Sequence, residues 1–370
     1  MNAWVEIDSK AIKYNLAQLK KMIGPKTMLM PVLKANAYGH GIMPMAKLCE
    51  SNPAVSRICV VNSQEALYLT NAGFKKPIII LSWFDFDPKI ALKLAKKSLI
   101  WPLFTLKQAK FLNQIGDKAK TKLKVHLKID IGASRVGILP NQITEFVGKI
   151  KKMKHIHIEG VYSHFSSSEE NREVTEEQLN IFQQAVKKLN ENGLKPVMRH
   201  VSCSAAGILY QTARLDGYRP GIAVYGLHPS NLTKSKINLK PALSWHTKII
   251  QIKRLPTGTK IGYDQTYTLK RPTVLAVLPI GYADGFDRRL SNQGEVLVNG
   301  KRCPVLGKVC MNLTMIDVTN CWSAREGDKA TLIGKQKNLI ITADDMAKWC
   351  QTINYEIVER INPQLERIYK

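Results

Sequence analysis

Acidic residues are scarce in this sequence, which has 29 Asp and Glu against 55 Lys and Arg and therefore a formal net charge of +26. This imbalance is typical either of a nucleic-acid-binding protein or of a basic enzyme whose lysines are solvated. The lysines are spread over nearly every expected helix, without a basic tail, an arginine-rich run or an RNA-module motif. We therefore expect weak, salt-sensitive attraction to polyanions and no specific nucleic-acid partner.

Paired cysteine motifs are also lacking. The seven cysteines are an odd number and have no CxxC spacing, which favours free thiols in a reducing cytosol over a disulfide framework. No cluster of His and Cys has the spacing of a zinc site, so we expect no metal. These two absences exclude a small disulfide-bonded scaffold and a zinc module.

Long hydrophobic runs are missing as well. The longest apolar stretches are only a few residues, so we expect no membrane-spanning segment and no membrane partner. The first residues read M-N-A-W-V-E-I-D and lack the basic start and apolar core of a signal peptide. A cytoplasmic location is the expectation.

The N-terminal two thirds of the chain alternate apolar, strand-like runs with helical patterns. Eight such strand–helix units in succession predict an α/β fold with a (β/α)8 TIM-type barrel. The eight strands are expected at Met28–Leu33, Ile58–Val61, Ile78–Leu81, Leu99–Leu103, Lys124–Asp130, Ile156–Tyr162, Met198–Ser202 and Ala213–Gly217. The clearest helices between them are expected at Ile42–Glu50, Gln64–Asn71, Leu106–Ile115, Ile143–Lys152 and Thr175–Asn192.

From about Leu239 the pattern changes to short β runs separated by turn signals. We therefore divide the chain into a barrel at 1–238 and a C-terminal mainly-β domain at 239–370. The strand candidate Ala3–Asp8 precedes all eight barrel strands, so we expect residues 1–9 to pack with the second domain. The expected C-terminal elements are strands at Ser244–Lys253, Thr273–Leu278, Val296–Val298, Met315–Val318 and Ala330–Ile333, and one closing helix at Ala343–Cys350.

The most informative stretch is Met28–Gly41, which reads M-L-M-P-V-L-K-A-N-A-Y-G-H-G. Its apolar run fits a buried parallel strand, which places Lys34 at the carboxyl end, where α/β folds carry their chemistry. A lysine held against apolar walls binds its proton less tightly, and its amine becomes a nucleophile toward an aldehyde. A lysine that bends out to solvent is the alternative, and these residues alone do not decide between the two.

A second informative strand reads K-V-H-L-K-I-D and alternates apolar with polar residues. In a barrel the apolar face meets the helices, so Lys124, His126, Lys128 and Asp130 are expected to point inward. Buried charges need partners.

The segment V-L-K-A-N-A-Y-G-H-G closely resembles the pyridoxal-phosphate lysine motif of the alanine racemase family. Further resemblances follow in chain order: I-G-A-S-R-V-G, Y-R-P-G-I-A-V-Y-G, I-G-Y-D-Q-T-Y-T, G-Y-A-D-G-F-D-R-R-L and G-K-V-C-M-N-L-T-M-I-D. The resemblance implies an enzyme, an alanine racemase, which interconverts L-alanine and D-alanine by a two-base mechanism on a pyridoxal-phosphate aldimine. The product would supply D-alanine for bacterial cell-wall peptidoglycan.

The resemblance also implies the two bases. Lys34 would carry pyridoxal 5′-phosphate and serve as one base, and Tyr263 would be the other, because racemisation needs proton exchange on both faces of a planar carbanion. A phenol has an ordinary pKa near 10, so positive neighbours must favour its ionised form. In the family this tyrosine reaches the active site of the other subunit, which implies a homodimer with shared sites. A tyrosine that simply packs in the β domain is the alternative.

Arg219 and His164 complete the implied catalytic set. Arg219 would meet the pyridine nitrogen of the cofactor and keep it unprotonated, and His164 would be bonded to Arg219. A strand-end histidine is more often a satisfied structural group, and Arg135 has the alternative of an inward pair with an aspartate. The resemblance implies these cofactor-binding residues: Lys34, Tyr38, Arg135, His164, Ser204, Arg219, Gly221, Ile222 and Tyr355. Arg135 and Met311 would bind the substrate carboxylate.

Three positions depart from the family pattern. Cys203 replaces an asparagine, Glu169 stands where an aspartate is common, and Lys308 stands where an arginine is common. The last two fall where family members line the entrance to the site. In some members the lysine that matches Lys128 is carbamylated, and the residue type permits this here.

Several alternatives of function remain. A racemase with a broader range of small amino acids is the first. A decarboxylase with the same barrel and β domain is the second, but those enzymes usually pair the ring nitrogen with an acid, where this sequence has Arg219. A non-catalytic pyridoxal-phosphate carrier has the barrel alone, and the domain after Leu239 argues against it.

Overall fold

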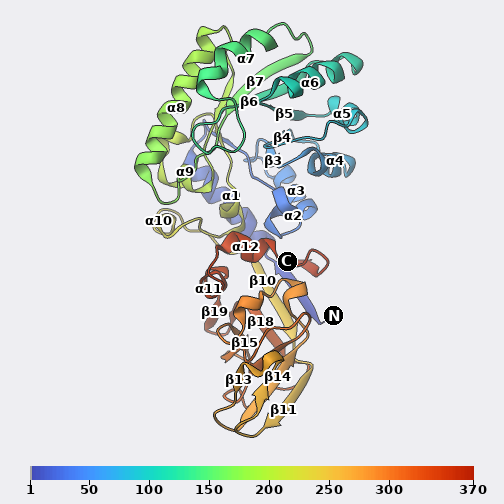
Figure 1. The fold of residues 1–370 in the computed structure, drawn as a ribbon, viewed down its shortest axis with the longest axis vertical. Helices are drawn as coiled ribbons and strands as arrows, with labels where there is room; N and C mark the ends of the chain where they lie inside the picture. The colour runs from blue at the N-terminus through green and yellow to red at the C-terminus, as the bar shows by residue number, and fades with distance from the viewer. Residues whose placement is uncertain (1) are drawn as a thin grey trace. The chain divides into compact units, whose positions relative to one another are not determined.

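The computed structural model describes residues 2–370 and divides the chain into two compact units (Figure 1). An α/β unit contains Ala11–Ala37 and Ile42–Lys240. A β-rich unit contains residues 2–10, Tyr38–Gly41 and Pro241–Lys370. The N-terminal segment and a tetrapeptide from the lysine motif thus belong to the same unit as the C-terminal third of the chain.

The α/β unit is a parallel barrel. A 6-stranded sheet has the order β3-β4-β5-β6-β7-β8, and a separate parallel pair joins β2 to β9. A bridge between Val32 and Cys59 links the chain after β2 to β3, and the amide of Arg219 donates to the Ser202 carbonyl to link β9 to β8. The strands are β2 (Met28–Leu29), β3 (Ile58–Val60), β4 (Ile78–Ile80), β5 (Leu99–Leu103), β6 (Leu123–Lys128), β7 (Ile156–Tyr162), β8 (Met198–His200) and β9 (Gly217–Tyr218). The predicted (β/α)8 plan is confirmed.

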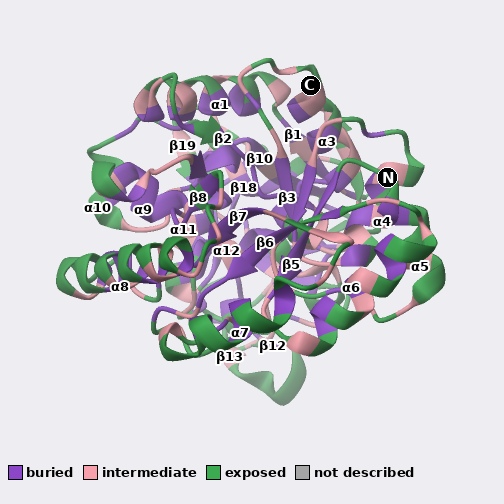
Figure 2. Cartoon of the chain, turned by 90° about the horizontal axis from the view of Figure 1, so that it is seen from above, coloured by how far each residue is buried: buried purple, intermediate pink, exposed green. Residues whose placement is uncertain are grey.

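Helices surround this sheet with their polar faces outward, as the green outer faces and purple strands of Figure 2 show. They begin at side-chain caps that the sequence supplies: Asn62 accepts from the Glu65 amide, and Thr105 forms a capping box with Gln108. The helices are α1 (Ser9–Ile23), α3 (Ile42–Ser51), α4 (Ser63–Asn71), α5 (Pro88–Ala95), α6 (Leu106–Lys118), α7 (Ile143–Ile150), α8 (Arg172–Glu191) and α9 (Ser204–Leu209).

The β-rich unit is organised around a 7-stranded sheet with the order β16-β15-β18-β10-β1-β20, in which β19 pairs with β18. Strand β1 pairs antiparallel with β10 and parallel with β20. A 3-stranded sheet of order β11-β14-β17 and the two-stranded β12–β13 complete the unit. The bounds are β1 (Ala3–Ile7), β10 (Leu243–Lys248), β11 (Gln251–Leu255), β12 (Lys260–Ile261), β13 (Tyr267–Thr268), β14 (Thr273–Leu278), β15 (Glu295–Val298), β16 (Lys301–Pro304), β17 (Thr314–Asp317), β18 (Lys329–Gln336), β19 (Leu339–Ile341) and β20 (Glu366–Tyr369).

Several elements differ from the sequence-based expectation, among them β2, which ends at Leu29 and not at Leu33. The strand expected at Ala213–Gly217 begins only at Gly217, because Gln211–Ala213 form a 3-10 turn. The single run Ser244–Lys253 is split into β10 and β11, which belong to different sheets. The closing helix α11 (Ala343–Trp349) is followed by a second helix, α12 (Asn354–Glu359).

Two further facts concern the whole described chain. All seven cysteines are free thiols. Among residues 2–370, no helix combines the length and the apolarity needed to cross a membrane.

Lys76 joins β4 to the end of α3 and provides a test of the fold. Its amine donates to the carbonyls of Cys49, Asn52 and Val55 at 2.9, 2.6 and 2.8 Å. Replacing Lys76 with Met leaves these carbonyls without their common donor, so we expect a loss of about 1–3 kcal/mol in the free energy of unfolding. The midpoint of urea unfolding measures it, and Lys75→Met is the matched control. Equal midpoints for the two variants would contradict this account.

Candidate active site

Lys34 begins a turn of unusual conformation. Residues Ala35, Asn36, Ala37 and Tyr38 have φ values of 51°, 51°, 55° and 54°, which form a left-handed turn labelled α2 (Lys34–Tyr38). Such a conformation costs about 1–2 kcal/mol per residue for side chains other than glycine. The strain is therefore concentrated immediately after the candidate lysine, where backbone strain often marks a functional site.

Hydrogen bonds hold this turn in place. Glu65 accepts from the Ala35 amide at 2.8 Å with one carboxylate oxygen and from the Val61 amide at 2.8 Å with the other. The side-chain oxygen of Asn36 accepts from the amide of Ile42 at 2.9 Å. Because Glu65 lies on α4 and Val61 follows β3, the neighbouring strand–helix unit fixes the direction in which Lys34 leaves the barrel.

Four cationic side chains meet in one cavity of about 270 Å³ in the α/β unit: Lys34, Lys128, Arg135 and Arg219. His164 and Tyr162 line the same cavity, and none of its lining residues is acidic. They come from the carboxyl ends of several strands or from the loops that follow, which is where barrels of this class place their active sites. Four of the residues expected at the site, Lys34, Arg135, His164 and Arg219, are thus brought together.

This positive cavity changes the protonation of the groups inside it. Desolvation, and then the charge of Arg135, lower the pKa of Lys34, which lines the cavity. Burial, and then Arg135 and Arg219, lower the pKa of Lys128 to about 8. Burial, and then the charge of Arg219, lower the pKa of His164 to about 3. Near neutral pH His164 is therefore neutral, and an anionic ligand would relieve the repulsion among the cations.

Arg219 is almost completely buried and is held by three neighbours. Its guanidinium donates to Nδ1 of His200 at 2.5 Å and to the carbonyls of Ser163 and Val201 at 2.6 and 3.1 Å. The expectation that His164 is the histidine bonded to Arg219 is therefore corrected: the bonded partner is His200. The sequence carried a signal for His200, which lies on the strand expected at Met198–Ser202, but no signal for the direction of its side chain.

A structural ion pair with an aspartate was the alternative role for Arg135. The nearby Asp130 instead bonds backbone amides. The Asp130 carboxylate accepts from the amides of Gly132 and Ser134 at 2.9 and 3.1 Å, which shapes the loop before Arg135. Arg135 itself is exposed at the cavity.

Ser204, Gly221 and Ile222 form a second polar group at the start of two helical turns. The Ser204 hydroxyl accepts from the amides of Gly221 at 2.9 Å and Ala223 at 3.4 Å. Such convergent amides and a hydroxyl are suited to an anion such as phosphate. The departure at Cys203 has a contact of its own, because its thiol lies 3.1 Å from the Ser168 hydroxyl.

The other expected site residues lie in the β-rich unit. The rings of Tyr38 and Tyr355 have centroids 6.1 Å apart. Tyr263 is 68% exposed and precedes Asp264, whose φ of 55° bends the turn. Lys308, another departure from the family pattern, forms an ion pair with Asp264 next to this tyrosine. Met311 is also exposed.

A barrel whose strand-end lysine lines a cationic cavity is the arrangement expected of an enzyme that uses a lysine on an anionic ligand. Models of the alanine racemase N-terminal and C-terminal domains match residues 7–229 and 242–369 of this chain. The chain belongs to the alanine racemase family and is an isomerase of that family. The resemblance identified from the sequence is thereby confirmed.

Relatives and solved structures agree with this assignment over the whole chain. An alanine racemase of Halothermothrix orenii is 41% identical over 369 residues, covering 99% of this chain and 96% of the relative. An alanine racemase of Methanococcus maripaludis is 38% identical and covers 99% of this chain and 98% of the relative. The crystal structure of alanine racemase from Streptomyces lavendulae has a TM-score of 0.94 at 29% identity and covers 100% of this chain and 97% of that chain. The alanine racemase of Bacillus anthracis with bound L-Ala-P has a TM-score of 0.92 at 34% identity, with coverages of 100% and 95%.

Lys128 tests the electrostatics of the cavity. Its pKa falls from 10.5 to about 8 on folding, so between these values the unfolded chain binds the proton more tightly and stability rises with pH. We expect the free energy of unfolding of the natural protein, relative to that of Lys128→Met, to increase between pH 7 and pH 10 by up to about 3 kcal/mol. Urea unfolding at several pH values measures it. Lys122→Met, which removes an exposed lysine, is the control, and a pH-independent difference would contradict the prediction.

Proposed function

We propose that this isomerase interconverts L-alanine and D-alanine with pyridoxal 5′-phosphate held by Lys34, and that it supplies D-alanine for bacterial cell-wall peptidoglycan. The observation that carries the proposal is the cavity in which Lys34, with its lowered pKa, lies among three further cations. An amine that releases its proton readily, beside groups that attract anions, suits an aldehyde cofactor that carries a phosphate.

The residues present fit that cofactor. The amides of Gly221 and Ile222, the hydroxyl of Ser204 and the phenols of Tyr38 and Tyr355 would hold its phosphate. Arg219 would meet its ring nitrogen, and because a guanidinium has only donors, the nitrogen beside it must accept. When bound, the cofactor supplies an electron sink for the charge that develops when the α-proton of the amino acid departs.

The protein residues then divide the remaining tasks. Lys34 moves a proton on one face of the substrate carbon, and Tyr263 moves a proton on the other face. Arg135 and the backbone at Met311 bind the substrate carboxylate. Arginine suits this task because its guanidinium is planar, stays charged and can donate two hydrogen bonds to one carboxylate. His164, neutral because its pKa is lowered, adds no further positive charge beside Arg219.

We also propose a homodimer in which each Tyr263 completes the site of the other subunit. In support, the exposed apolar or aromatic side chains of the β-rich unit include Tyr263, Tyr282, Met311, Leu313 and Ile353. Exposed side chains of this kind are enriched at interfaces between subunits. Within this proposal the barrel at 1–238 holds the cofactor, and the domain at 239–370 contributes the second base.

The alternatives are weaker on specific grounds. A decarboxylase of the same plan would favour an acid at the ring nitrogen, whereas the buried cavity residue here is Arg219. A cofactor carrier would need only the barrel, whereas both family models match this chain. A racemase of a broader set of small amino acids remains the second candidate, because Lys308 and Glu169 differ from the family pattern near the entrance.

Lys34 should carry the cofactor covalently. Purified protein supplied with pyridoxal phosphate is expected to be yellow, and borohydride reduction should fix the cofactor on the peptide that contains Lys34. Peptide mass spectrometry checks the position, and Lys34→Ala, which lacks the amine, is the control. Reduction that labels Lys128 instead would refute the assignment.

Tyr263 should be needed for only one enantiomer. Tyr263→Phe removes the phenol and keeps the ring, so cofactor binding should survive while racemisation falls roughly two to four orders of magnitude. In deuterated water the variant should still exchange the α-proton of D-alanine faster than that of L-alanine, because Lys34 remains. Mass spectrometry of the recovered alanine measures both rates.

The same variants test the shared site. Mixed dimers of Lys34→Ala and Tyr263→Phe subunits contain one site with both intact residues, so part of the activity should return. Equal exchange of the two enantiomers would contradict the two-base scheme. Verified mixed dimers without recovered activity would contradict the shared site.

A further inference from the structure

Arg219 is the first member of a chain of buried side chains that runs through the barrel interior, away from the cavity. It donates to Nδ1 of His200 at 2.5 Å. Nε2 of His200 lies 2.8 Å from Nδ1 of His126, and Nε2 of His126 lies 3.0 Å from Oε2 of Glu159. Both histidines are fully buried, so these contacts are their means of satisfying ring nitrogens.

The two ends of this chain fix the proton on every ring nitrogen. A guanidinium has only donors, so Nδ1 of His200 must accept and its proton sits on Nε2. His126 must then accept at Nδ1 and donate from Nε2 to the carboxylate of Glu159. Each imidazole is thereby neutral and carries its proton on Nε2, and burial, which lowers the pKa of both, acts in the same direction.

The backbone is shaped to bring Glu159 into this position. The pairing of β6 with β7 shifts between Val125, opposite Ile158, and His126, opposite Gly160, so that Glu159 is left over as a β-bulge. Bulges re-aim side chains near active sites. A Cβ atom on Gly160 would lie 2.7 Å from Nε2 of His126, so glycine at this position leaves room for the ring.

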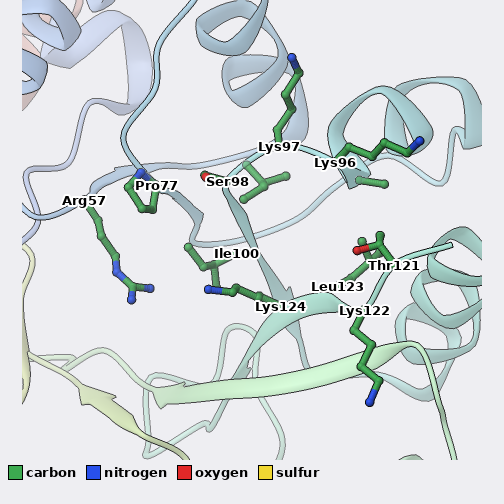
Figure 3. Close-up of a pocket in the computed structure, with 12 residues that line it drawn as sticks. Arg57, Pro77, Lys96, Lys97, Ser98, Ile100, Thr121, Lys122, Leu123 and Lys124 are labelled. Carbon is green, nitrogen blue, oxygen red and sulfur yellow. The ribbon is translucent and has the colours of Figure 1, made fainter. Parts of the chain in front are cut away.

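Other contacts hold the two ends still. His200 stacks on Tyr162 with ring centroids 5.1 Å apart and an angle of 6° between the planes. At the far end, Arg57 forms an ion pair with Glu159, and Lys124 donates to it at 3.0 Å. Figure 3 shows Arg57 and Lys124 pointing toward one another in a pocket of about 260 Å³, whereas Lys96, Lys97 and Lys122 point away. Burial by itself would raise the pKa of Glu159, but the bonds from His126 and Arg57 outweigh it and the net shift is downward.

We propose that Glu159 is a positioning residue for the racemase reaction: through the fixed tautomers of His126 and His200 it holds the guanidinium of Arg219 in one orientation. The inference rests on the proposed role of Arg219 at the ring nitrogen. A carboxylate is required because it only accepts, and any group that donates to His126 would reverse both tautomers.

The double variant Arg57→Leu with Glu159→Gln is the direct test. Oε2 of Glu159 accepts from both Arg57 and His126, and Oε1 accepts from Lys124, so Arg57 must be removed before an amide can turn. Lys124 should then retain the amide oxygen and turn the amide nitrogen toward His126. Both imidazoles would then carry their protons on Nδ1, and that of His200 would oppose the donor of Arg219. We expect kcat to fall roughly 10–100-fold, as for other groups that orient a functional side chain from behind, with little change in KM.

The readout that a merely structural role would not move is the tautomer itself. In holoenzyme labelled with ¹⁵N-histidine, the shifts of His126 and His200 should show protonated Nε2 in the natural protein and protonated Nδ1 in the double variant. Arg57→Leu alone, which keeps the carboxylate, should show protonated Nε2. Glu159→Asp, which keeps the carboxylate, should keep the natural tautomers. Glu145→Gln, which removes an exposed carboxylate paired with Lys149, should change neither the shifts nor kcat.

The outcomes separate this inference from the proposed function. Protonated Nδ1 or a charged ring at either histidine in the natural protein would overturn the inference, even if the double variant failed to fold. A kcat in the double variant equal to that of Arg57→Leu alone would also overturn it. Failure of borohydride to label Lys34 would instead overturn the proposed function. The tautomers would still report whether His126 and His200 carry their protons on Nε2.

Discussion

Repulsion among like charges at one end of the barrel is the constraint on which the rest of the site depends. Lys34, Lys128, Arg135 and Arg219 line one cavity without an acidic partner among its lining residues. Burial and, after it, the charges of the neighbouring cations lower the pKa values of Lys34, Lys128 and His164. The same concentration of positive charge attracts anions to the cavity. The carboxylate that balances buried Arg219 is Glu159, which lies outside the cavity at the end of the chain of histidines.

Rigidity around Lys34 and Arg219 is achieved by different means. The left-handed turn after Lys34 is unfavourable by itself, and bonds to Glu65 and Asn36 compensate for it. Arg219 is held by carbonyls and by His200, whose own partners extend to Glu159. In both cases a carboxylate outside the cavity sets the geometry of a cation inside it. Such an arrangement orients the functional groups without neutralising them at the site.

Much of the fold could be predicted, because it depends on local patterns. Strands β5, β7 and β14 have the predicted bounds, since their apolar residues alternate or run without interruption between clear turn signals. The prediction was less successful where the chain changes direction: Ser244–Lys253 reads as one β run, but Ile249 and Ile250 connect strands of two different sheets. The helix that carries Tyr355 was missed because six residues give little periodicity.

The sequence by itself determined the family, the candidate lysine and the set of residues around it, because short motifs keep their residue types wherever the chain folds. Only the tertiary structure decided which of them touch. It assigned His200 and not His164 to Arg219, and it turned Glu159 inward by a bulge that no alternation of residues predicts. Side-chain hydrogen bonds between residues 33 and 74 positions apart in the sequence create that chain. The direction in which such a side chain points depends on strand register and on the shape of the barrel interior. Both are defined only when all the strands have paired.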